Sequence, residues 1–136
     1  MKTRIGLFLT MFVAAALLVS MQAAAAEQAV NAKTVAEHMD KGKYSSSEIK
    51  TYLKGLKGGT ITADGKVHDI LTGKTGTRVV LSVAAGRNND FVVDVYVNDA
   101  SAIHNGDKVS CSGEYVKYNM FTVNGITLKN GSCKKH

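Results

Sequence analysis

The sequence predicts a mainly β protein, a small closed five-stranded barrel preceded by a short helical segment. Residues 59–130 are rich in Val, Ile, Thr and Gly and alternate apolar with polar positions, whereas residues 27–57 carry apolar residues at helical spacing. Gly58 and Gly59 separate the two regions. A flat sheet of this size would expose its edge strands, so we expect the strands to close on themselves.

The first 26 residues have the order of a secretory signal peptide. A basic start with Lys2 and Arg4 precedes an apolar run of about 15 residues and a small-residue segment with Ala24 and Ala26. A spanning helix needs about 20 apolar residues. Cleavage after Ala26 is therefore favoured over the alternative, an uncleaved N-terminal anchor, and we expect a periplasmic or secreted protein without a membrane span.

Removal of 26 of the 136 residues leaves 110, enough for one domain with a modest core. The leader contains Lys2 and Arg4 of the 17 basic residues and none of the 11 acidic ones, which leaves 15 basic against 11 acidic, a net charge of +4. This mild surplus favours anionic partners only weakly.

Residues 27–58 are expected to form two helices. The first, over residues 29–39, has Val30, Val35 and Met39 partly in register. The second, over residues 46–57, starts with the capping-box spacing of Ser45 and Glu48 and has Gly58 placed for its C-terminal cap. Its apolar stripe consists of Ile49, Tyr52, Leu53 and Leu56.

Turn residues divide the remaining chain into five strands. They are expected at residues 60–71, 77–84, 91–98, 108–118 and 121–130. A short helical turn around residues 99–104 joins the third and fourth strands. Gly65 and Gly113 are placed where long strands must bend to close a barrel.

Five short segments carry a resemblance to a known family. They are G-K-V-H-D-I at 65–70, V-V-L-S-V at 79–83, V-D-V-Y-V at 93–97, N-G-D-K-V-S-C-S-G at 105–113 and I-T-L-K-N-G-S-C at 126–133. With them, residues 59–133 resemble the OB-fold, and within it the bacterial tRNA-anti-like OB-fold family. The resemblance implies a Greek-key barrel over residues 59–136. Its second and third strands, with the loops after strands one and four, would form a face of the kind that binds oligonucleotides or oligosaccharides.

Cys111 and Cys133 are the two cysteines of the chain. An even number in an exported protein favours a disulfide, and a hairpin of the last two strands brings both residues into one neighbourhood. For a loop of about 20 residues such a bond stabilises by around 3 kcal/mol in the chain-entropy model. A buried thiol pair or a redox-active pair are the alternatives, and the chain has no C-x-x-C motif to support the second.

The expected binding face carries mixed side chains. Strand two presents Arg78, Val80 and Ser82, and strand three presents Val92, Asp94 and Tyr96. With the nearby loops, the candidate ligand-binding residues are Lys74, Arg78, Arg87, Tyr96, Lys117 and Tyr118. Single-stranded nucleic acid binders stack bases on several aromatic rings along a positive groove. One aromatic ring beside a carboxylate fits that pattern incompletely, and the alternative for Tyr96 is an ordinary surface residue.

No sequence pattern supports catalysis. No nucleophile is paired with a recognisable base, and His68, His104 and His136 lack metal-ligand spacing with the cysteines or with each other. We therefore expect a non-enzymatic exported binding module without a cofactor. Candidate partners are an oligonucleotide or another anionic polymer, an oligosaccharide, or an envelope protein that contacts the helix of residues 46–57 or a free strand edge.

Overall fold

The computed structural model describes residues 28–85, 89–119 and 124–136. In these residues the elements follow the order β1 (Val30–Asn31), α2 (Ala32–His38), α3 (Ser46–Leu56), β2 (Thr60–Gly73), β3 (Gly76–Ala85), β4 (Asn89–Val97), β5 (Lys108–Asn119) and β6 (Gly125–Lys135). The predicted signal peptide, residues 1–26, lies outside the described residues. No helix of the described part is both long enough and apolar enough to cross a bilayer.

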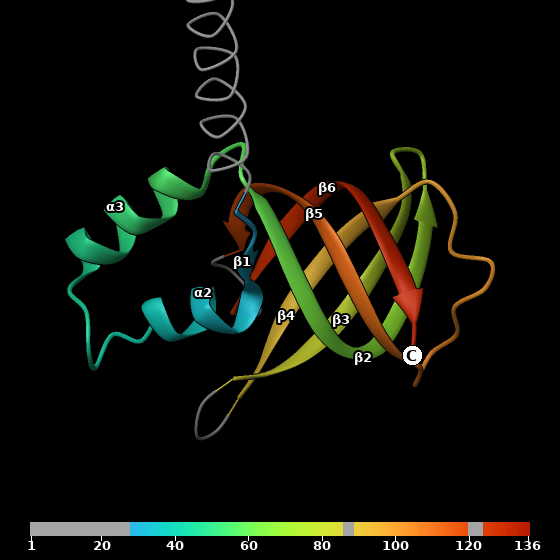
Figure 1. Ribbon diagram of the computed structural model, residues 1–136, viewed down its shortest axis with the longest axis horizontal. Helices are drawn as coiled ribbons and strands as arrows, with labels where there is room; N and C mark the ends of the chain where they lie inside the picture. Colours follow the sequence, from blue (N-terminus) through green and yellow to red (C-terminus); the bar gives the residue numbers. More distant parts are fainter. Residues whose placement is uncertain (1–27, 86–88, 120–123) are drawn as a thin grey trace, which may run out of the picture.

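Strands β2 to β6 close a barrel (Figure 1). Hydrogen-bonded neighbours follow the order β2-β3-β4-β6-β5, and β5 pairs again with β2. These pairings are antiparallel, except that β4 and β6 run parallel. Within the described residues the protein is therefore a five-stranded Greek-key barrel of the OB-fold type with an N-terminal helical extension, as the sequence predicts.

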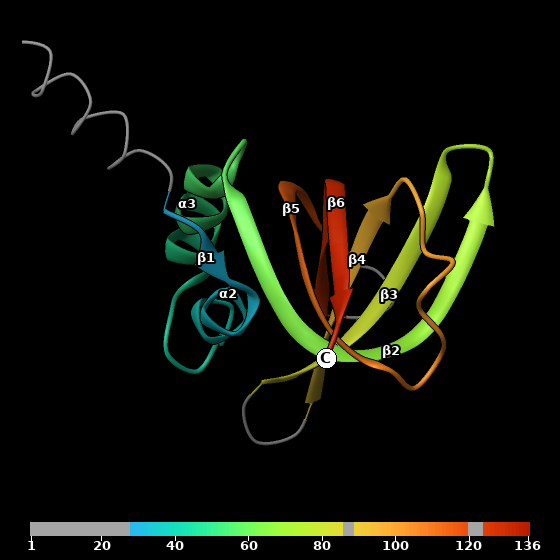
Figure 2. The same ribbon diagram turned by 45° about the vertical axis from the view of Figure 1, so that its right-hand side comes forward.

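The longest strand, β2, bends around the barrel so that its first half pairs with β5 and its second half with β3 (Figure 2). An added Cβ at Gly65, near the middle of β2, would lie 2.5 Å from the carbonyl oxygen of Ser82. An added Cβ at Gly113 on β5 would lie 2.9 Å from the Cβ of Leu128. Both predicted bends therefore fall where two backbones approach so closely that only glycine fits.

Aliphatic side chains fill the barrel and alternate with polar side chains along the strands. The largest of the side chains that are less than 2% exposed are Phe91, Ile61, Leu81, Ile126, Leu128, Val35, Val79, Val93, Val95 and Val109. The alternation predicted for residues 79–83 and 91–97 is confirmed, because the odd-numbered side chains of both segments are buried. Burial of these side chains is the main force that holds the barrel closed.

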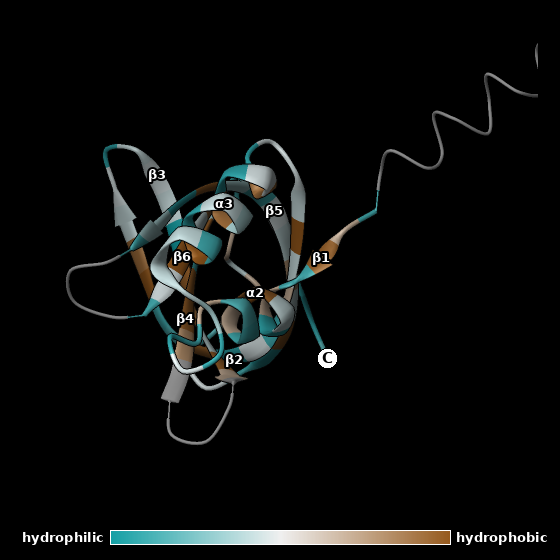
Figure 3. Ribbon diagram, turned by 90° about the vertical axis from the view of Figure 1, so that its left-hand side faces the viewer, coloured by the Kyte–Doolittle hydropathy of each residue, from teal (hydrophilic) through white to brown (hydrophobic). Residues whose placement is uncertain are grey.

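The helical extension covers one end of the barrel (Figure 3). Ala32 and Val35 of α2 are fully buried and Met39 is 7% exposed, so this helix completes the core. The connection between β4 and β5 runs along the end of the barrel that lies away from the helices (Figure 1), and its Ile103 is 6% exposed. Each end of the core is thus covered by a different segment.

The helix predicted over residues 29–39 is shorter in the structure, where α2 spans Ala32–His38. Val30 and Asn31 form the short strand β1, which pairs in parallel with the beginning of β2. Asn31 then serves as the N-cap of α2, and its side-chain oxygen accepts a hydrogen bond from the backbone N–H of Lys33 at 2.9 Å. The β-branched Val30 joins a sheet edge that the sequence pattern does not reveal.

The capping signals of α3 are confirmed. The Ser45 hydroxyl accepts from the N–H of Glu48 at 3.2 Å, and the Glu48 carboxylate accepts from the N–H of Ser45 at 2.7 Å. Gly58 follows the helix with φ +77°, the left-handed conformation expected of a C-terminal glycine. Ile49 and Leu56 are 9% and 7% exposed, so part of the apolar stripe of α3 is buried within the protein.

An aromatic stack joins the two helices. The ring of His38, the last residue of α2, lies 4.1 Å from the ring of Tyr52 on α3 and 5.2 Å from that of Tyr44, with interplanar angles of 6° and 14°. A ring nitrogen of His38 also lies 3.0 Å from the carbonyl oxygen of Thr34. The stacked rings hold α3 against α2, and the contact with Thr34 fixes the orientation of the His38 ring.

The last strand and the connection between β4 and β5 can each be compared with the prediction. The last strand is predicted over residues 121–130, of which 121–123 lie outside the described residues. The described strand β6 runs from Gly125 to Lys135, because its polar second half pairs with the start of β5. Residues 99–104, where a short helical turn is predicted, contain one hydrogen-bonded turn, in which the N–H of Ile103 donates to the carbonyl of Ala100 at 3.0 Å. The other strands begin and end within two residues of their predicted limits.

A disulfide joins Cys111 and Cys133, so the predicted pairing is confirmed. The two residues face each other directly in the β5–β6 ladder, with their Cα atoms 4.0 Å apart. Cys111 is 3% exposed and belongs to the core. The bond therefore fastens the C-terminal half of β6 to β5, where β6 has passed the end of its pairing with β4.

Candidate functional site

An open groove of about 640 Å³ lies on the outer face of β3, β4, β6 and β5. Most of its polar lining comes from three kinds of side chain. They are the cationic Arg78, Lys117 and Lys129, the carboxylate of Asp94 beside the ring of Tyr96, and the amide and hydroxyl residues Thr75, Thr77, Asn98, Asn119, Thr127 and Asn130. The groove therefore combines positive charge with many hydrogen-bonding groups.

Strand register brings these side chains together. Arg78 on β3 lies opposite Tyr96 on β4, and Asp94 lies two residues before Tyr96 on the same face. Asp94 is opposite Thr127 on β6, which in turn is opposite Lys117 on β5. The neighbours of these residues along β3 and β4 point into the core, so the set faces outward.

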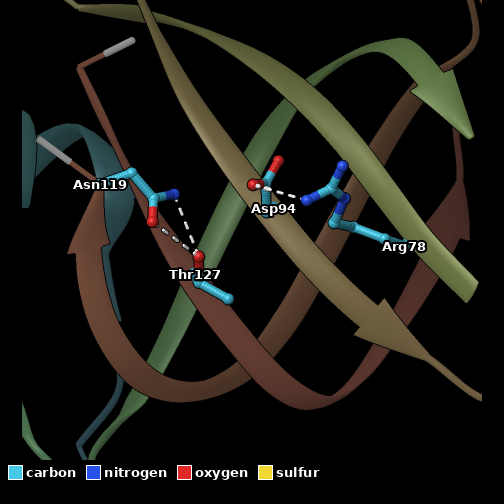
Figure 4. A network of polar contacts seen from close by, with 4 residues as sticks. All are labelled: Arg78, Asp94, Asn119 and Thr127. Carbon is cyan, nitrogen blue, oxygen red and sulfur yellow. Dashed lines mark hydrogen bonds and ion pairs between the residues drawn. The ribbon is translucent and has the colours of Figure 1, made fainter. Parts of the chain in front are cut away.

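Asp94 is the most enclosed charged group of the groove. Its side chain is 16% exposed, and this burial raises the pKa of the carboxyl, while the nearby positive charges of Arg78 and Lys117 act in the opposite direction. Nη1 of Arg78 lies 3.7 Å from Oδ2 of Asp94 (Figure 4), farther than a charge-assisted hydrogen bond allows. The two groups attract each other without a direct hydrogen bond.

Asn119 and Thr127 hold each other in place beside Asp94 (Figure 4). The amide nitrogen of Asn119 lies 3.0 Å from the Thr127 hydroxyl, which lies 3.2 Å from the Asn119 carbonyl oxygen. Thr127 is 6% exposed. This reciprocal pair fixes the orientation of both side chains on the floor of the groove.

The rim of the groove is shaped by an irregularity in β6. Asn130 has φ +50°, a conformation that asparagine tolerates better than most residues. The β5–β6 register shifts nearby, and Lys129 there faces Glu114, with Nζ 3.8 Å from Oε1. The irregularity places Lys129 and Asn130, which are consecutive, in the same groove lining.

The structure brings together three of the six predicted ligand-binding residues, Arg78, Tyr96 and Lys117. Lys74 lies in the β2–β3 turn and is not among the residues that line the groove, although the adjacent Thr75 is. Tyr118 packs partly against the core, and its hydroxyl donates a hydrogen bond to Oδ1 of Asn124 at 2.6 Å. Arg87 lies outside the described residues.

Sequence reasoning missed most of the contribution of β6. Lys129 and Thr127 line the groove because β6 lies between β4 and β5, a parallel neighbour to one and an antiparallel neighbour to the other. Alternation along residues 125–130 could have marked Thr127 and Lys129 as outward-facing. The closure of the barrel decides which strands flank β6, and the sequence of β6 alone does not predict them.

A second polar cluster lies on the outer face of β2, β5 and the C-terminal end of the chain. The Ser110 hydroxyl donates to Oδ1 of Asp64 and lies 2.7 Å from Nε2 of His136. In a Ser-His-Asp triad the imidazole stands between the hydroxyl and the carboxylate. Here the hydroxyl stands between the other two groups, so the imidazole is not oriented by the carboxylate.

The described residues contain no group of three or more His, Cys, Asp or Glu side chains that could hold a metal ion. Comparison of the chain with protein-family models, curated proteins and solved structures gives no match in any of the three.

Proposed function

We propose that the protein is an exported, non-enzymatic OB-fold module that binds an anionic polymer in the groove on β3, β4, β6 and β5. The observation that carries this proposal is the convergence of Arg78, Lys117 and Lys129, from three different strands, around Asp94 and Tyr96. Three lining cations outnumber the carboxylates of Asp94 in the lining and of Glu114, which pairs with Lys129 at the rim, so the groove keeps a net positive charge. A local positive potential concentrates an anionic ligand.

Two features support export to an oxidising compartment. The first 26 residues have the pattern of a cleavable signal peptide. The disulfide between Cys111 and Cys133 is of the kind that persists in the periplasm or outside the cell. The resemblance to the tRNA-anti-like OB-fold family adds the expectation that this face of the barrel binds a polymer.

The lining of the groove supports binding without catalysis. Among the residues that line it, Asp94 is the single carboxylate, and none is a cysteine, serine or histidine. General acid–base and nucleophilic mechanisms need paired groups within hydrogen-bond reach of each other. The groove offers charge, amides and one aromatic ring, which suit recognition.

The alternative, a protein-interaction module that uses α3, has less support. Ile49 and Leu56 are buried in the hydrophobic core cluster, and Tyr52 is stacked on His38. The apolar stripe of α3 is therefore largely occupied within the protein.

The test is the salt dependence of binding to the oxidised mature protein. We expect fluorescence anisotropy to detect binding of oligogalacturonate or of a single-stranded oligonucleotide that weakens as salt rises. The variants Arg78→Gln and Lys117→Gln should each weaken binding and reduce the magnitude of the slope of log K against log salt by about 1. Lys54→Gln, an exposed position on α3, is the matched control. If neither polymer binds, or if Lys54→Gln has the same effect as the groove variants, the proposal fails.

A further inference from the structure

We infer that the polymer is an acidic oligosaccharide, and that Asp94 accepts a hydrogen bond from one of its sugar hydroxyls. The inference rests on the proposed function, because it concerns the same groove. The inference starts from Asp94, a negatively charged carboxylate at the centre of a groove that is proposed to bind anions.

Asp94 has charge partners but no hydrogen-bond donor among the described residues. The approach of Arg78 at 3.7 Å is an ion pair and not a hydrogen bond. Within the described part of the chain, no side-chain nitrogen or oxygen that is sealed from solvent lacks a hydrogen-bond partner. The carboxylate oxygens of Asp94 are therefore still reached by solvent, although the side chain is only 16% exposed. They are free to accept from a ligand.

A half-buried carboxylate is costly unless a donor satisfies it. A sugar hydroxyl supplies such a donor, while the carboxylate group of the same acidic sugar pairs with the surrounding cations. A phosphodiester supplies one negative charge for every nucleotide and no donor of its own, so Asp94 would repel it. RNA adds a single 2′-hydroxyl for each of those charges, whereas an acidic sugar chain carries more hydroxyls for each charge. The central carboxylate therefore favours a chain that carries both hydroxyls and negative charges.

The aromatic content of the lining also favours an oligosaccharide over a single-stranded nucleic acid. Proteins that hold single-stranded nucleic acids without sequence preference stack successive bases on several aromatic side chains. Tyr96 is the one aromatic residue among those that line this groove. One ring is enough to pack against the apolar face of a single sugar. The Asn119–Thr127 pair beside Asp94 offers further polar groups to neighbouring hydroxyls.

The cations of the groove favour binding of an acidic saccharide over a neutral one. Arg78 is 35% exposed at its side chain and keeps donors available, because its contact with Asp94 at 3.7 Å does not engage them in hydrogen bonds. Its guanidinium matches the geometry of a carboxylate. Lys117 is exposed and lies across β6 from Asp94. Asp94 thus has a cation on either side, Arg78 diagonally across the β3–β4 ladder and Lys117 across β6, which fits acidic groups on either side of a hydroxyl.

The experiment compares four probes of matched length on the oxidised full mature chain: oligogalacturonate, a neutral maltooligosaccharide, oligo(dT) and oligo(dC). We expect oligogalacturonate to bind tightest. Asp94→Asn should weaken its binding about fivefold to tenfold, because the amide oxygen still accepts but the hydrogen bond is no longer charge-assisted. The same variant should strengthen any binding of oligo(dT), because a repelling charge is gone. Glu37→Gln, an exposed carboxylate on α2, controls for the change in net charge.

Other outcomes overturn the inference in distinguishable ways. Tight binding of oligo(dC) that is lost in Asp94→Asn would assign the carboxylate to a base amino group, which oligo(dT) lacks. The proposed anionic polymer would then stand and the saccharide would not. Failure of all four probes would remove the proposed function as well. Should Asp94→Asn not fold, the carboxyl ¹³C signal of Asp94 in the unmodified protein must shift on adding oligogalacturonate, and a constant signal rejects the inference.

Discussion

Arg78 on β3 and Asp94 on β4 face each other diagonally across the ladder, with Nη1 of the arginine 3.7 Å from Oδ2 of the aspartate. The residues directly opposite them are Tyr96 and Val80, so the pair is offset by two positions. The distance allows attraction but no direct hydrogen bond. Both charges therefore remain available at the surface of the groove, and several consequences can be measured.

Removal of the charge at Asp94 should stabilise the protein at neutral pH. Burial raises the folded-state pKa of this carboxyl above its unfolded value of about 3.9, so its contribution to stability is fully present below that pH. It is lost as pH rises through the raised folded pKa. Asp94→Asn should therefore increase the free energy of unfolding at pH 7, and the gain should vanish in acid.

Urea unfolding at a series of pH values checks this expectation. A variant that is less stable than the unmodified protein at pH 7 would show that the attraction of Arg78 and Lys117 outweighs the burial of the carboxylate. A gain in stability together with a loss of ligand binding is the pattern of a residue retained for function.

Reduction of the disulfide should lower the free energy of unfolding by about 3 kcal/mol, because Cys111 and Cys133 close a loop with a sequence separation of 22. The paired replacement of both residues by serine should cost more, because it also buries a hydroxyl at position 111. Urea titration of the oxidised and reduced protein measures the difference. Mass spectrometry after thiol alkylation, with and without reductant, verifies the starting state. Equal unfolding midpoints would mean that the β5–β6 ladder holds the C-terminal segment without the bond.

Two glycines of β2 provide a matched pair of substitutions. A Cβ at Gly65 would lie 2.5 Å from the carbonyl oxygen of Ser82, whereas a Cβ at Gly73 would meet nothing within 4 Å. Gly65→Ala should therefore destabilise the barrel by about 1–3 kcal/mol, the usual cost of overpacking. Gly73→Ala should stay within about 0.5 kcal/mol of the unmodified protein. Thermal or urea unfolding compares them, and equal effects would argue against a close approach at the bend.

Loss of the cap on α3 should loosen the helical extension more than the barrel. Ser45→Ala removes the hydroxyl that accepts from the N–H of Glu48, at a cost of about 1 kcal/mol. Hydrogen exchange of α3 amides should accelerate about fivefold, while core amides of β3 and β4 follow global stability. Lys50→Gln, an exposed position in the same helix with little change in helix propensity, is the control. Uniform acceleration throughout the chain would mean that α3 and the barrel unfold together.

The same cap makes α3 sensitive to acid. Hydrogen bonds from the backbone and hydroxyl of Ser45 hold the pKa of Glu48 below its usual value. The stability contributed by this carboxylate is therefore present above its unfolded pKa and is lost as pH falls through the folded one. Protection factors of α3 amides, which correct for the slower intrinsic exchange in acid, should fall in that range, and Glu48→Gln should remove the dependence.

Much of the fold could be predicted from local pattern. Alternation in residues 77–84 and 91–98 located two core strands, because the two faces of a strand differ in burial. Ser45, Glu48 and Gly58 located α3, because capping depends on residues adjacent in sequence. The limits of α2 and β6 were less accurate, because β1 and the polar end of β6 are ordered by pairing with distant strands.

The candidate site was predictable along the β3–β4 hairpin, and Lys117 of β5 was the one predicted groove residue outside it. Arg78, Asp94 and Tyr96 could be placed on one face because a hairpin fixes its own register. Thr127 and Lys129 could not be joined to them, because the parallel pairing of β4 with β6 crosses a long stretch of chain.

By itself, the sequence determined the mainly β class and the order of the two helices and five barrel strands, and it favoured the pairing of the two cysteines, since each depends on alternation, on turn residues or on a residue count. Tertiary structure alone decided that Thr127 and Lys129 share a groove with Arg78, Asp94, Tyr96 and Lys117. The reason is physical: periodicity tells which way a side chain points, and only the closure of the barrel tells which strands lie next to each other.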